Sequence, residues 1–480
     1  MAKEALDEQA LRRRADAAGQ GHVFRFWQDL SEDGRQRLLE QVAEIDFEEL
    51  SHLIHEHITN RRPPELPPHL EPAPFIPLPS EPQERMRRPR MHRLGGQLLA
   101  AGRVAALTVA GGQGTRLGFG GPKGAFAIGP VSQRPLFQIF AEAIHAARHT
   151  FDAPLPWYIM TSRANDRATR DFFDTYNYFD LPRQDVKFFT QGTMPAVDFQ
   201  GKLILEERGQ LSWSPDGHGG SVRALARSGM LADMRQRGID IISYFQVDNP
   251  LVPPIDPAFI GYHAEARSDM SSKMARKRTP DEKVGNFCVS GGRLYVIEYS
   301  DLPKELEQQR LGDGSLRFAA GSIAIHILDR RFVERLNSGT RFALPFHRAE
   351  KKIPFVDEQG LPHSPQKPNG IKFETFVFDA LPMAERPVIL EIDRALEFSP
   401  VKNADGEDSP ATARRDMVRV AARSLEEAGA LVPRGPDGEP KFKVEISPLA
   451  AGDVGELKDL VARLGLKEVT GDLYLGPEMA

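Results

Sequence analysis

The sequence has one cysteine, no excess of basic residues and no long uncharged apolar run, and each absence excludes a class of protein. Cys288 cannot form an internal disulfide, and its apolar context, NFCVSGG, favours a small core residue over a nucleophile. Lysine and arginine number 62 against 67 aspartates and glutamates, which argues against nucleic acid or a membrane as a partner. The N-terminal segment lacks the apolar core of a signal peptide, so the expected compartment is cytoplasmic.

The 480 residues are enough for two or three hydrophobic cores, and the sequence pattern divides them into three parts. Residues 1–98 are predicted to form an N-terminal lobe that is helical from Glu4 to about Asn60, followed by a connector over RRPPELPPHLEPAPFIPLPSEPQERMRRPR. Proline recurs too often in this connector for a helix or a central strand. Residues 99–403 are predicted to form the main domain, and residues 404–480 a small C-terminal domain that begins with the helical stretch ATARRDMVRVAARSLEEAG.

The main domain alternates apolar strand-like runs with helical patterns. VAALTVA, PWYIMTS and IDIISYFQV are predicted strands, and PLFQIFAEAIHAARHT and GGSVRALARSGMLADMRQRG are predicted helices. Continuous apolar strands separated by helices predict an α/β fold with a mostly parallel, mixed sheet that is covered on both faces.

A glycine-rich stretch, LTVAGGQGTRLGFGGPKG, contains the end of the first of these strands. It lacks the Gly-Lys-Ser/Thr ending of a Walker A loop, and its glycines do not have the spacing of a dinucleotide-binding turn. Glycines let backbone N–H groups approach a polyphosphate, and Arg116 and Lys123 add positive charge that would neutralise it. The local chemistry leaves one alternative open, a glycine-rich surface turn with incidental charge.

The stretch GGQGTRLG followed by PKG resembles the signature of eukaryotic-type UDP-N-acetylglucosamine pyrophosphorylases, a branch of the UTP–sugar-1-phosphate uridylyltransferases. The resemblance extends in order from roughly Leu99 to Met417 through QGTMPAVDFQGKLILEE, SPDGHGG, YFQVDNPLVPPIDPAFIGYH, EKVGNF, VIEYSDLP, LPFHRAEKKIPFVD, PNGIKFETFVFDALP and EFSPVKN. It implies a Rossmann-like nucleotidyltransferase core as the main domain. The implied reaction makes UDP-N-acetylglucosamine and pyrophosphate from UTP and N-acetylglucosamine 1-phosphate.

The resemblance also implies a role for individual residues. Asp248, which follows the strand IDIISYFQV, would contact the nucleotide phosphates and bind Mg²⁺ or Mn²⁺; a lone aspartate at such a place is otherwise more often a cap. Arg116, Lys123, Lys372 and Lys402 would hold the phosphates during catalysis. The other implied nucleotide contacts are Val109, Ala110, Gly111, Gly112, Gln191 and Gly217, and the implied sugar contacts are Gly285, Glu298, Tyr299 and, around the N-acyl group, Phe378.

Two positions depart from the family pattern, and both lie on the sugar side. His218 stands in PDGHGG where the family has asparagine, as in UDP-glucose pyrophosphorylases, and Ser322 stands where a second asparagine is usual. Glucose 1-phosphate or another hexose 1-phosphate is therefore an alternative substrate. A nucleotide-binding regulator without catalysis is a further alternative, but the complete set of phosphate-binding cations argues against it.

Overall fold

The computed structural model describes residues 7–61, 66–80, 82–339 and 341–479. Contacts divide the chain into two compact units. The first comprises Met1–Pro67, Gln191–Ser221 and Leu344–Val377, and the second comprises Pro68–Thr190, Val222–Ala343 and Phe378–Ala480. The first unit thus combines the N-terminal lobe with two segments from the middle of the chain, whereas the boundaries at residues 98 and 403 stay a prediction.

The second unit contains a large mixed sheet. β2 (Val104–Val109) lies between β10 (Ile241–Gln246) and β3 (Trp157–Thr161), and β4 (Val186–Thr190) follows β3, all four being parallel. β14 (Ala320–Asp329) runs antiparallel to β10 and joins it to the rest of the sheet. That remainder consists of β1 (Glu71–Pro72), β11 (Met270–Arg276), β12 (Asn286–Ser290), β13 (Arg293–Ile297) and β19 (Val388–Glu391). The α/β class and the three predicted strands are confirmed.

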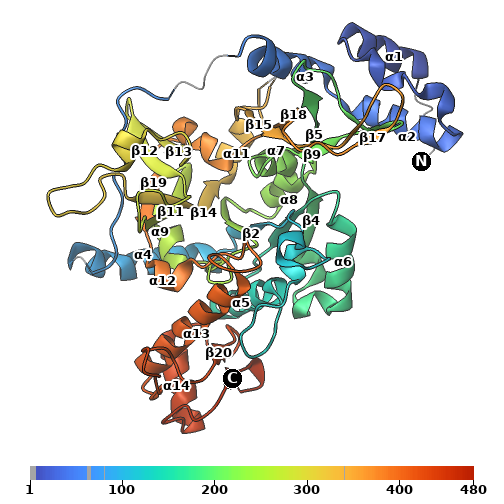
Figure 1. The fold of residues 1–480 in the computed structure, drawn as a ribbon. Helices are drawn as coiled ribbons and strands as arrows, with labels where there is room; N and C mark the ends of the chain where they lie inside the picture. The colour runs from blue at the N-terminus through green and yellow to red at the C-terminus, as the bar shows by residue number, and fades with distance from the viewer. Residues whose placement is uncertain (1–6, 62–65, 81, 340, 480) are drawn as a thin grey trace. The chain divides into compact units, whose positions relative to one another are not determined.

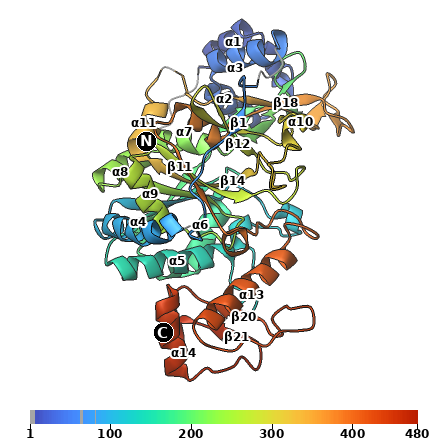
Figure 2. The same ribbon diagram turned by 90° about the vertical axis from the view of Figure 1, so that its left-hand side faces the viewer.

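Aromatic side chains pack the parallel strands against their helices. Phe137 and Phe140 of α5 (Leu136–Phe151) make edge contacts with Trp157 of β3 and Phe245 of β10, at centroid distances of 6.3 and 5.2 Å. All four rings are buried, and burial of such a ring contributes roughly 1.5–3 kcal/mol. Figures 1 and 2 show α5 beside the sheet, together with α4 (Pro82–Ala100), α6 (Asp166–Thr175), α9 (Pro257–Ala266) and α11 (Arg330–Leu336).

The extended connector ends earlier than the sequence predicted, because the helix α4 begins at Pro82 and continues through Pro89. Proline inside a helix removes a hydrogen bond, so tertiary packing must stabilise α4. That packing is close: a Cβ on Gly95 of α4 would stand 1.8 Å from the Pro257 carbonyl oxygen, and one on Gly261 would stand 1.9 Å from the Met91 carbonyl oxygen. Residues 66–80 of the connector, which the structure describes, contain β1 and no helix, in agreement with the prediction.

Two other helical predictions need correction. The stretch predicted as one helix at 219–238 forms α7 (Gly220–Arg227) and α8 (Met230–Gln236), separated at Gly229, whose φ of 78° is left-handed. In the C-terminal part, α13 (Pro410–Glu427), β20 (Val444–Ile446) and β21 (Leu473–Leu475) agree with the predicted pattern, but α14 (Val454–Leu464) was missed. Figure 2 shows α13, α14, β20 and β21 together beyond α5.

The first unit has its own core. Helices α1 (Glu8–Ala17), α2 (Glu32–Glu44) and α3 (Phe47–Ile54) pack against a small sheet of β15 (His347–Lys351), β18 (Gly370–Glu374) and β6 (Val197–Asp198). Their contacts include Val42, Leu50, Val197, Ile371 and Phe373, all buried. The predicted helical start at Glu4 lies outside the described residues.

The expectation for Cys288 is confirmed, because the thiol is buried in β12 and burial raises its pKa to about 12. A thiol with this pKa is a poor nucleophile at neutral pH. No helix among the described residues is long and apolar enough to cross a membrane.

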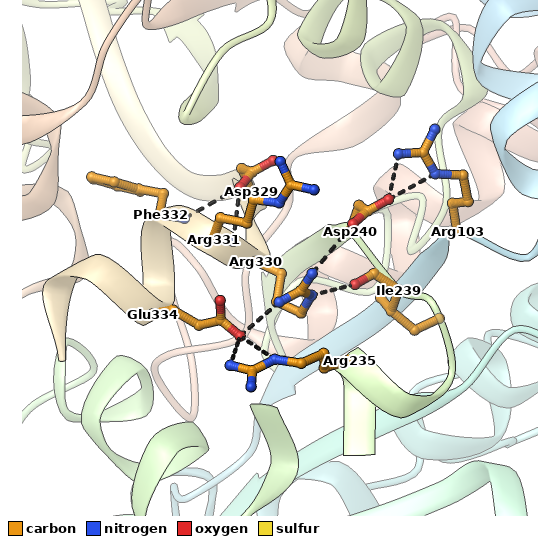
Figure 3. A network of polar contacts seen from close by, with 9 residues as sticks. All are labelled: Arg103, Arg235, Ile239, Asp240, Asp329, Arg330, Arg331, Phe332 and Glu334. Atoms are coloured by element: carbon orange, nitrogen blue, oxygen red, sulfur yellow. Dashed lines mark hydrogen bonds and ion pairs between the residues drawn. The ribbon is translucent and has the colours of Figure 1, made fainter. Parts of the chain in front are cut away.

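A network of charges joins the strands at the amino edge of β2 and β10 (Figure 3). Arg330, 9% exposed, donates to the Ile239 carbonyl at 2.6 Å and to Glu334 at 2.6 Å, and it pairs with Asp240 at 3.4 Å. Asp240 also accepts from Arg103 Nε at 2.7 Å, and Glu334 accepts from Arg235 Nη2 at 2.7 Å. We call Arg103, Arg235, Asp240, Arg330 and Glu334 the amino-edge network.

Candidate active site

The glycine-rich loop and Asp248 leave the sheet next to each other. The last residues of β2 and β10, Val109 and Gln246, are paired in register, and the Val247 N–H donates to the Val109 carbonyl at 3.1 Å. The loop from Ala110 onward and Asp248 therefore lie at the carboxyl edge of the strands. This is the edge at which open α/β sheets bind ligands.

The predicted nucleotide cradle, Val109 to Gly112, starts in β2 and continues into the loop. Asn165, which is buried, donates through Nδ2 to the carbonyls of Ala110 at 2.8 Å and Gly112 at 3.2 Å. The Lys123 N–H donates to the same Gly112 carbonyl at 3.1 Å. The loop is thus fixed at both ends, while Arg116 between them is exposed on a 3₁₀ turn.

Asn165 escaped the sequence analysis because it lies 53 residues from Gly112 along the chain. Its only signal was its place after the predicted strand PWYIMTS, at the same edge of the sheet.

Three chain segments bring charges together at this edge. Lys123 Nζ stands 3.8 Å from Asp248 Oδ2 and donates to the Val401 carbonyl at 3.3 Å, while the Val401 N–H donates to the Asp248 carbonyl at 2.7 Å. Lys402 follows, with Nζ 3.9 Å from Asp408 Oδ2. We call Lys123, Asp248, Val401 and Lys402 the carboxyl-edge cluster. Both ion pairs are near the 4 Å limit, so a phosphate could replace the carboxylate partners.

A cavity of about 170 Å³ opens beside this cluster. Five of the residues predicted for phosphate or sugar contacts line it, namely Asp248, Gly285, Glu298, Ser322 and Lys402. A Cβ on Gly285 would stand 2.5 Å from Val296 Cγ1, so only glycine fits there without displacement. Residues far apart in the sequence thus line one cavity, while their roles in binding stay predictions.

Two predicted sugar contacts of the second unit lie elsewhere. Tyr299 is 41% exposed and Phe378 is buried, and neither is among the described residues that line the cavity. Their predicted roles stay predictions.

Asn249 also lines the cavity and was missed by the sequence analysis. Its Nδ2 donates to the Glu397 carbonyl at 2.7 Å, and its Oδ1 accepts from the Ser399 N–H at 3.0 Å. Asn249 therefore fixes the segment that leads to Lys402. Buried Lys273 pairs with the Glu397 carboxylate and reinforces this arrangement.

In the first unit, the predicted uracil contacts Gln191 and Gly217 are hydrogen-bonded, with Gln191 Nε2 donating to the Gly217 carbonyl at 2.7 Å. Gly217 has a φ of 83°, and a Cβ there would stand 2.2 Å from the Thr375 carbonyl oxygen. The left-handed backbone and the close contact each exclude a side chain at this position. Glycine is therefore required where the loop packs against Thr375, the residue after β18.

His218 is held in one orientation in this loop. Its Nδ1 accepts from the Val377 N–H at 3.2 Å, and its ring lies 5.3 Å from that of Phe376. Burial, and secondarily nearby His347, lowers the pKa of His218 to about 4. The ring is therefore neutral near pH 7, and an Nδ1 acceptor leaves Nε2–H as the donor.

Lys372 lies in β18, opposite Ala349 of β15.

The chemistry of the carboxyl-edge cluster fits a magnesium ion held largely by its substrate. No group of three or more His, Cys, Asp or Glu side chains in the described part of the chain is placed to hold a metal. Magnesium commonly takes one or two carboxylates and completes its octahedron with phosphate oxygens and water. Asp248, the carboxylate of the cluster, matches this requirement.

Comparisons with known proteins show the family to which the chain belongs. The sequence profile of the family described as UTP–glucose-1-phosphate uridylyltransferase matches residues 81–409. The chain belongs to this family. It is 39% identical to the human UDP-N-acetylhexosamine pyrophosphorylase-like protein 1 over 471 residues, covering 92% of this chain and 93% of the relative. It is 36% identical to the UDP-N-acetylglucosamine pyrophosphorylase of Saccharomyces cerevisiae over 436 residues, covering 87% and 91%.

Solved structures of the uridylyltransferase family have the same fold. The uridine diphosphate N-acetylglucosamine pyrophosphorylase of Trypanosoma brucei, solved with an inhibitor, superposes with a TM-score of 0.79 at 29% identity, covering 97% of this chain and 96% of that one. The family and the Rossmann-like core that the sequence predicted are therefore confirmed.

Proposed function

We propose that this protein transfers the uridylyl group of UTP to N-acetylglucosamine 1-phosphate, producing UDP-N-acetylglucosamine and pyrophosphate. The observation that supports this most is the cavity in which Asp248, Glu298 and Lys402 meet beside Lys123. It combines a carboxylate and cations for phosphates with polar groups for a sugar. Membership of the family and the names of the relatives support the same reaction.

The reaction needs no protein nucleophile or general base. A phosphate oxygen of the sugar 1-phosphate forms a bond to the α-phosphorus of UTP, and the bond from that phosphorus to the bridging oxygen breaks as pyrophosphate leaves. The attacking monoester is already anionic, so no proton has to be removed. The protein must instead bring anions together in line and stabilise the charge on the leaving group.

The cations of the second unit suit these tasks. Lys123, fixed by the loop geometry, and exposed Arg116 would bind the β- and γ-phosphates, and Lys402 the sugar phosphate. Asp248 would hold Mg²⁺ or Mn²⁺, which supplies neutralisation of phosphate charge when bound. The proposal also includes contacts of Lys372 with the sugar phosphate and of Gln191 and Gly217 with uracil. It further includes a cytoplasmic location and no nucleic-acid partner.

A second candidate function is the same transfer to glucose 1-phosphate. The observation that favours it is the presence of His218 and Ser322 where the sugar side of the family pattern has two asparagines. Asparagine offers a donor and an acceptor in one amide, whereas the neutral His218 ring has its acceptor engaged by Val377.

Pyrophosphate release from UTP, measured with a panel of sugar 1-phosphates, tests these functions. We expect the highest kcat/KM with N-acetylglucosamine 1-phosphate. A higher value with glucose 1-phosphate would favour the second function. No release with any sugar, despite UTP binding, would contradict both and indicate a nucleotide-binding regulator.

A further inference from the structure

A groove of about 500 Å³ lies in the second unit, apart from the carboxyl-edge cluster. One wall is the beginning of α13, a second is the segment at Pro130 and Gln133, and a third is the loop from Glu439 to Lys443, with Asp472 beside it. A volume of this size suits a small molecule. The groove shares no lining residue with the cavity at Asp248.

The groove is cationic. Arg414, Arg415, Lys441 and Lys443 line it, against two carboxylates. Both carboxylates have other partners: Glu439 accepts from Arg419 Nε at 2.8 Å, and Asp472 accepts from the Lys443 backbone N–H at 2.9 Å. In the described part of the chain neither lysine ammonium has a carboxylate within 4 Å. Arg415 pairs with Asp416, which lies outside the lining, with Nε 3.4 Å from Oδ1. Among the described residues, the positive charge left without a carboxylate partner is therefore that of Arg414, Lys441 and Lys443.

The walls of the groove are firmly joined. Glu445 of β20 accepts from the backbone N–H groups of Val131 at 2.8 Å and Ser132 at 2.7 Å, and from the Ser132 hydroxyl at 2.5 Å. The Ser447 hydroxyl donates to Glu142 of α5 at 2.7 Å. A ligand would thus bind to a preformed surface, which lowers the ordering cost of binding.

Arg414 connects the groove to the glycine-rich loop. Its Nη2 donates to the Ala127 carbonyl at 2.8 Å, four residues beyond Lys123, and its guanidinium lies 6.0 Å from the ring of Phe126. Phe126 makes an edge contact with Phe119 at 5.7 Å.

Phe119 in turn packs under the loop itself. A Cβ added to Gly114 would stand 2.7 Å from the Phe119 ring, and one added to Gly121 would stand 2.9 Å from it. Arg116 lies between these two glycines in the sequence. A chain of direct contacts thus runs from the groove to the loop that carries Arg116 and Lys123.

We propose that this groove is a second anion site, which binds a small molecule carrying a phosphate group and alters the glycine-rich loop through Arg414. Arginine and lysine side chains from separate segments converge on one place, as charge-assisted binding of phosphate oxygens requires. A phosphate that engages Arg414 competes with its bond to Ala127 and so changes the support beneath the loop. The binding step does not depend on the proposed catalytic function; only the effect on activity does.

The test uses hydrogen exchange of the full-length protein titrated with inorganic phosphate at constant ionic strength. The amides at 131–133 and 441–443 report on the groove, and those at 114–121 and 123–127 report on the loop; the prolines at 122, 130 and 440 have no N–H. The variant Lys441→Glu/Lys443→Glu is compared with Lys458→Glu/Lys467→Glu, which reverses the same number of exposed charges in the same C-terminal segment.

We expect wild type and the control to show protection at the groove and a change at the loop over the same phosphate range. In Lys441→Glu/Lys443→Glu, groove binding should weaken by about tenfold or more, because two attractive charges become repulsive. An equal response of groove amides in all three proteins, or no response in wild type, would overturn the site. In the same variant the loop change should shift to higher phosphate together with the groove, which separates it from direct binding of phosphate at Arg116 and Lys123. Groove protection in wild type without any change at the loop, or a loop change that keeps its wild-type phosphate range in Lys441→Glu/Lys443→Glu, would overturn the coupling. Pyrophosphate release assays of the same variants separate either failure from a failure of the proposed function.

Discussion

The two edges of the parallel strands carry similar charged side chains in different states of pairing. At the amino edge, Arg330 makes contacts of 2.6 Å to Ile239 and Glu334 and is almost buried. At the carboxyl edge, the nearest carboxylate oxygens stand 3.8 Å from Lys123 and 3.9 Å from Lys402. Charges of the first kind are satisfied by the protein, whereas charges of the second kind still have the capacity to bind an anion. The difference separates a structural edge from a candidate catalytic one.

The largest effect is expected when the carboxylate of the carboxyl-edge cluster is removed. Asp248→Asn is expected to abolish turnover or to remove most of its dependence on Mg²⁺ or Mn²⁺, because the amide is a much weaker ligand for a hard cation. Initial rates across a metal titration measure the effect. Full wild-type activity in excess chelator would rule out the metal role.

The next effect concerns the loop cations. Lys123→Ala and Arg116→Ala should each lower kcat roughly 30- to 1000-fold. Each substitution removes a contact to developing charge, which stabilises the transition state by about 2–4 kcal/mol. Thermal unfolding of both variants should stay near wild type. Near-wild-type turnover of both at saturating substrate would contradict their assignment.

A substitution in the amino-edge network should lower stability and leave activity unchanged, whereas a substitution of the loop cations should do the reverse. Arg330→Met removes the guanidinium that joins the Ile239 carbonyl to Glu334, and should lower the free energy of unfolding by about 1.5–3 kcal/mol, the value of a hydrogen bond to a charged group; Glu334 keeps its bond to Arg235. Activity per folded molecule should be unchanged. Denaturant unfolding and active-site titration measure the two quantities, and a loss of specific activity with intact stability would reverse the roles of the two edges.

The smallest effect concerns sugar choice. His218→Asn with Ser322→Asn should shift the ratio of kcat/KM towards N-acetylglucosamine 1-phosphate by roughly 1 kcal/mol, or about fivefold, the value of one hydrogen bond. Because the pKa of His218 is lowered to about 4, the ring is neutral above about pH 5, and the wild-type ratio should not titrate through His218 between pH 6 and 8. A ratio that is the same in the double variant would mean that both substitutions are silent.

The sequence predicted the carboxyl edge well because local patterns define it. Each apolar run predicts a strand, and the glycines or Asp248 that follow it mark the carboxyl end of that strand, where open α/β sheets bind ligands. The α/β class followed from the same runs.

What the sequence did not predict depends on contacts between distant residues. Asn165 and Asn249 act through hydrogen bonds to carbonyls 53 and 148 residues away, and no local pattern distinguishes them from other asparagines. The helix through Pro89 was missed for the same reason, because its packing on α9 overrides the preference of proline. The grouping of residues 191–221 and 344–377 with the N-terminal lobe likewise has no local signal.

The most direct test of the account is the initial rate of pyrophosphate release from UTP and N-acetylglucosamine 1-phosphate by wild type, Lys123→Ala and Arg330→Met, each normalised to its folded fraction. We predict turnover by wild type, the same turnover by Arg330→Met, and a loss of roughly 30-fold or more in Lys123→Ala. No pyrophosphate from wild type, or equal rates from all three proteins, would contradict the claim that the carboxyl edge performs uridylyl transfer.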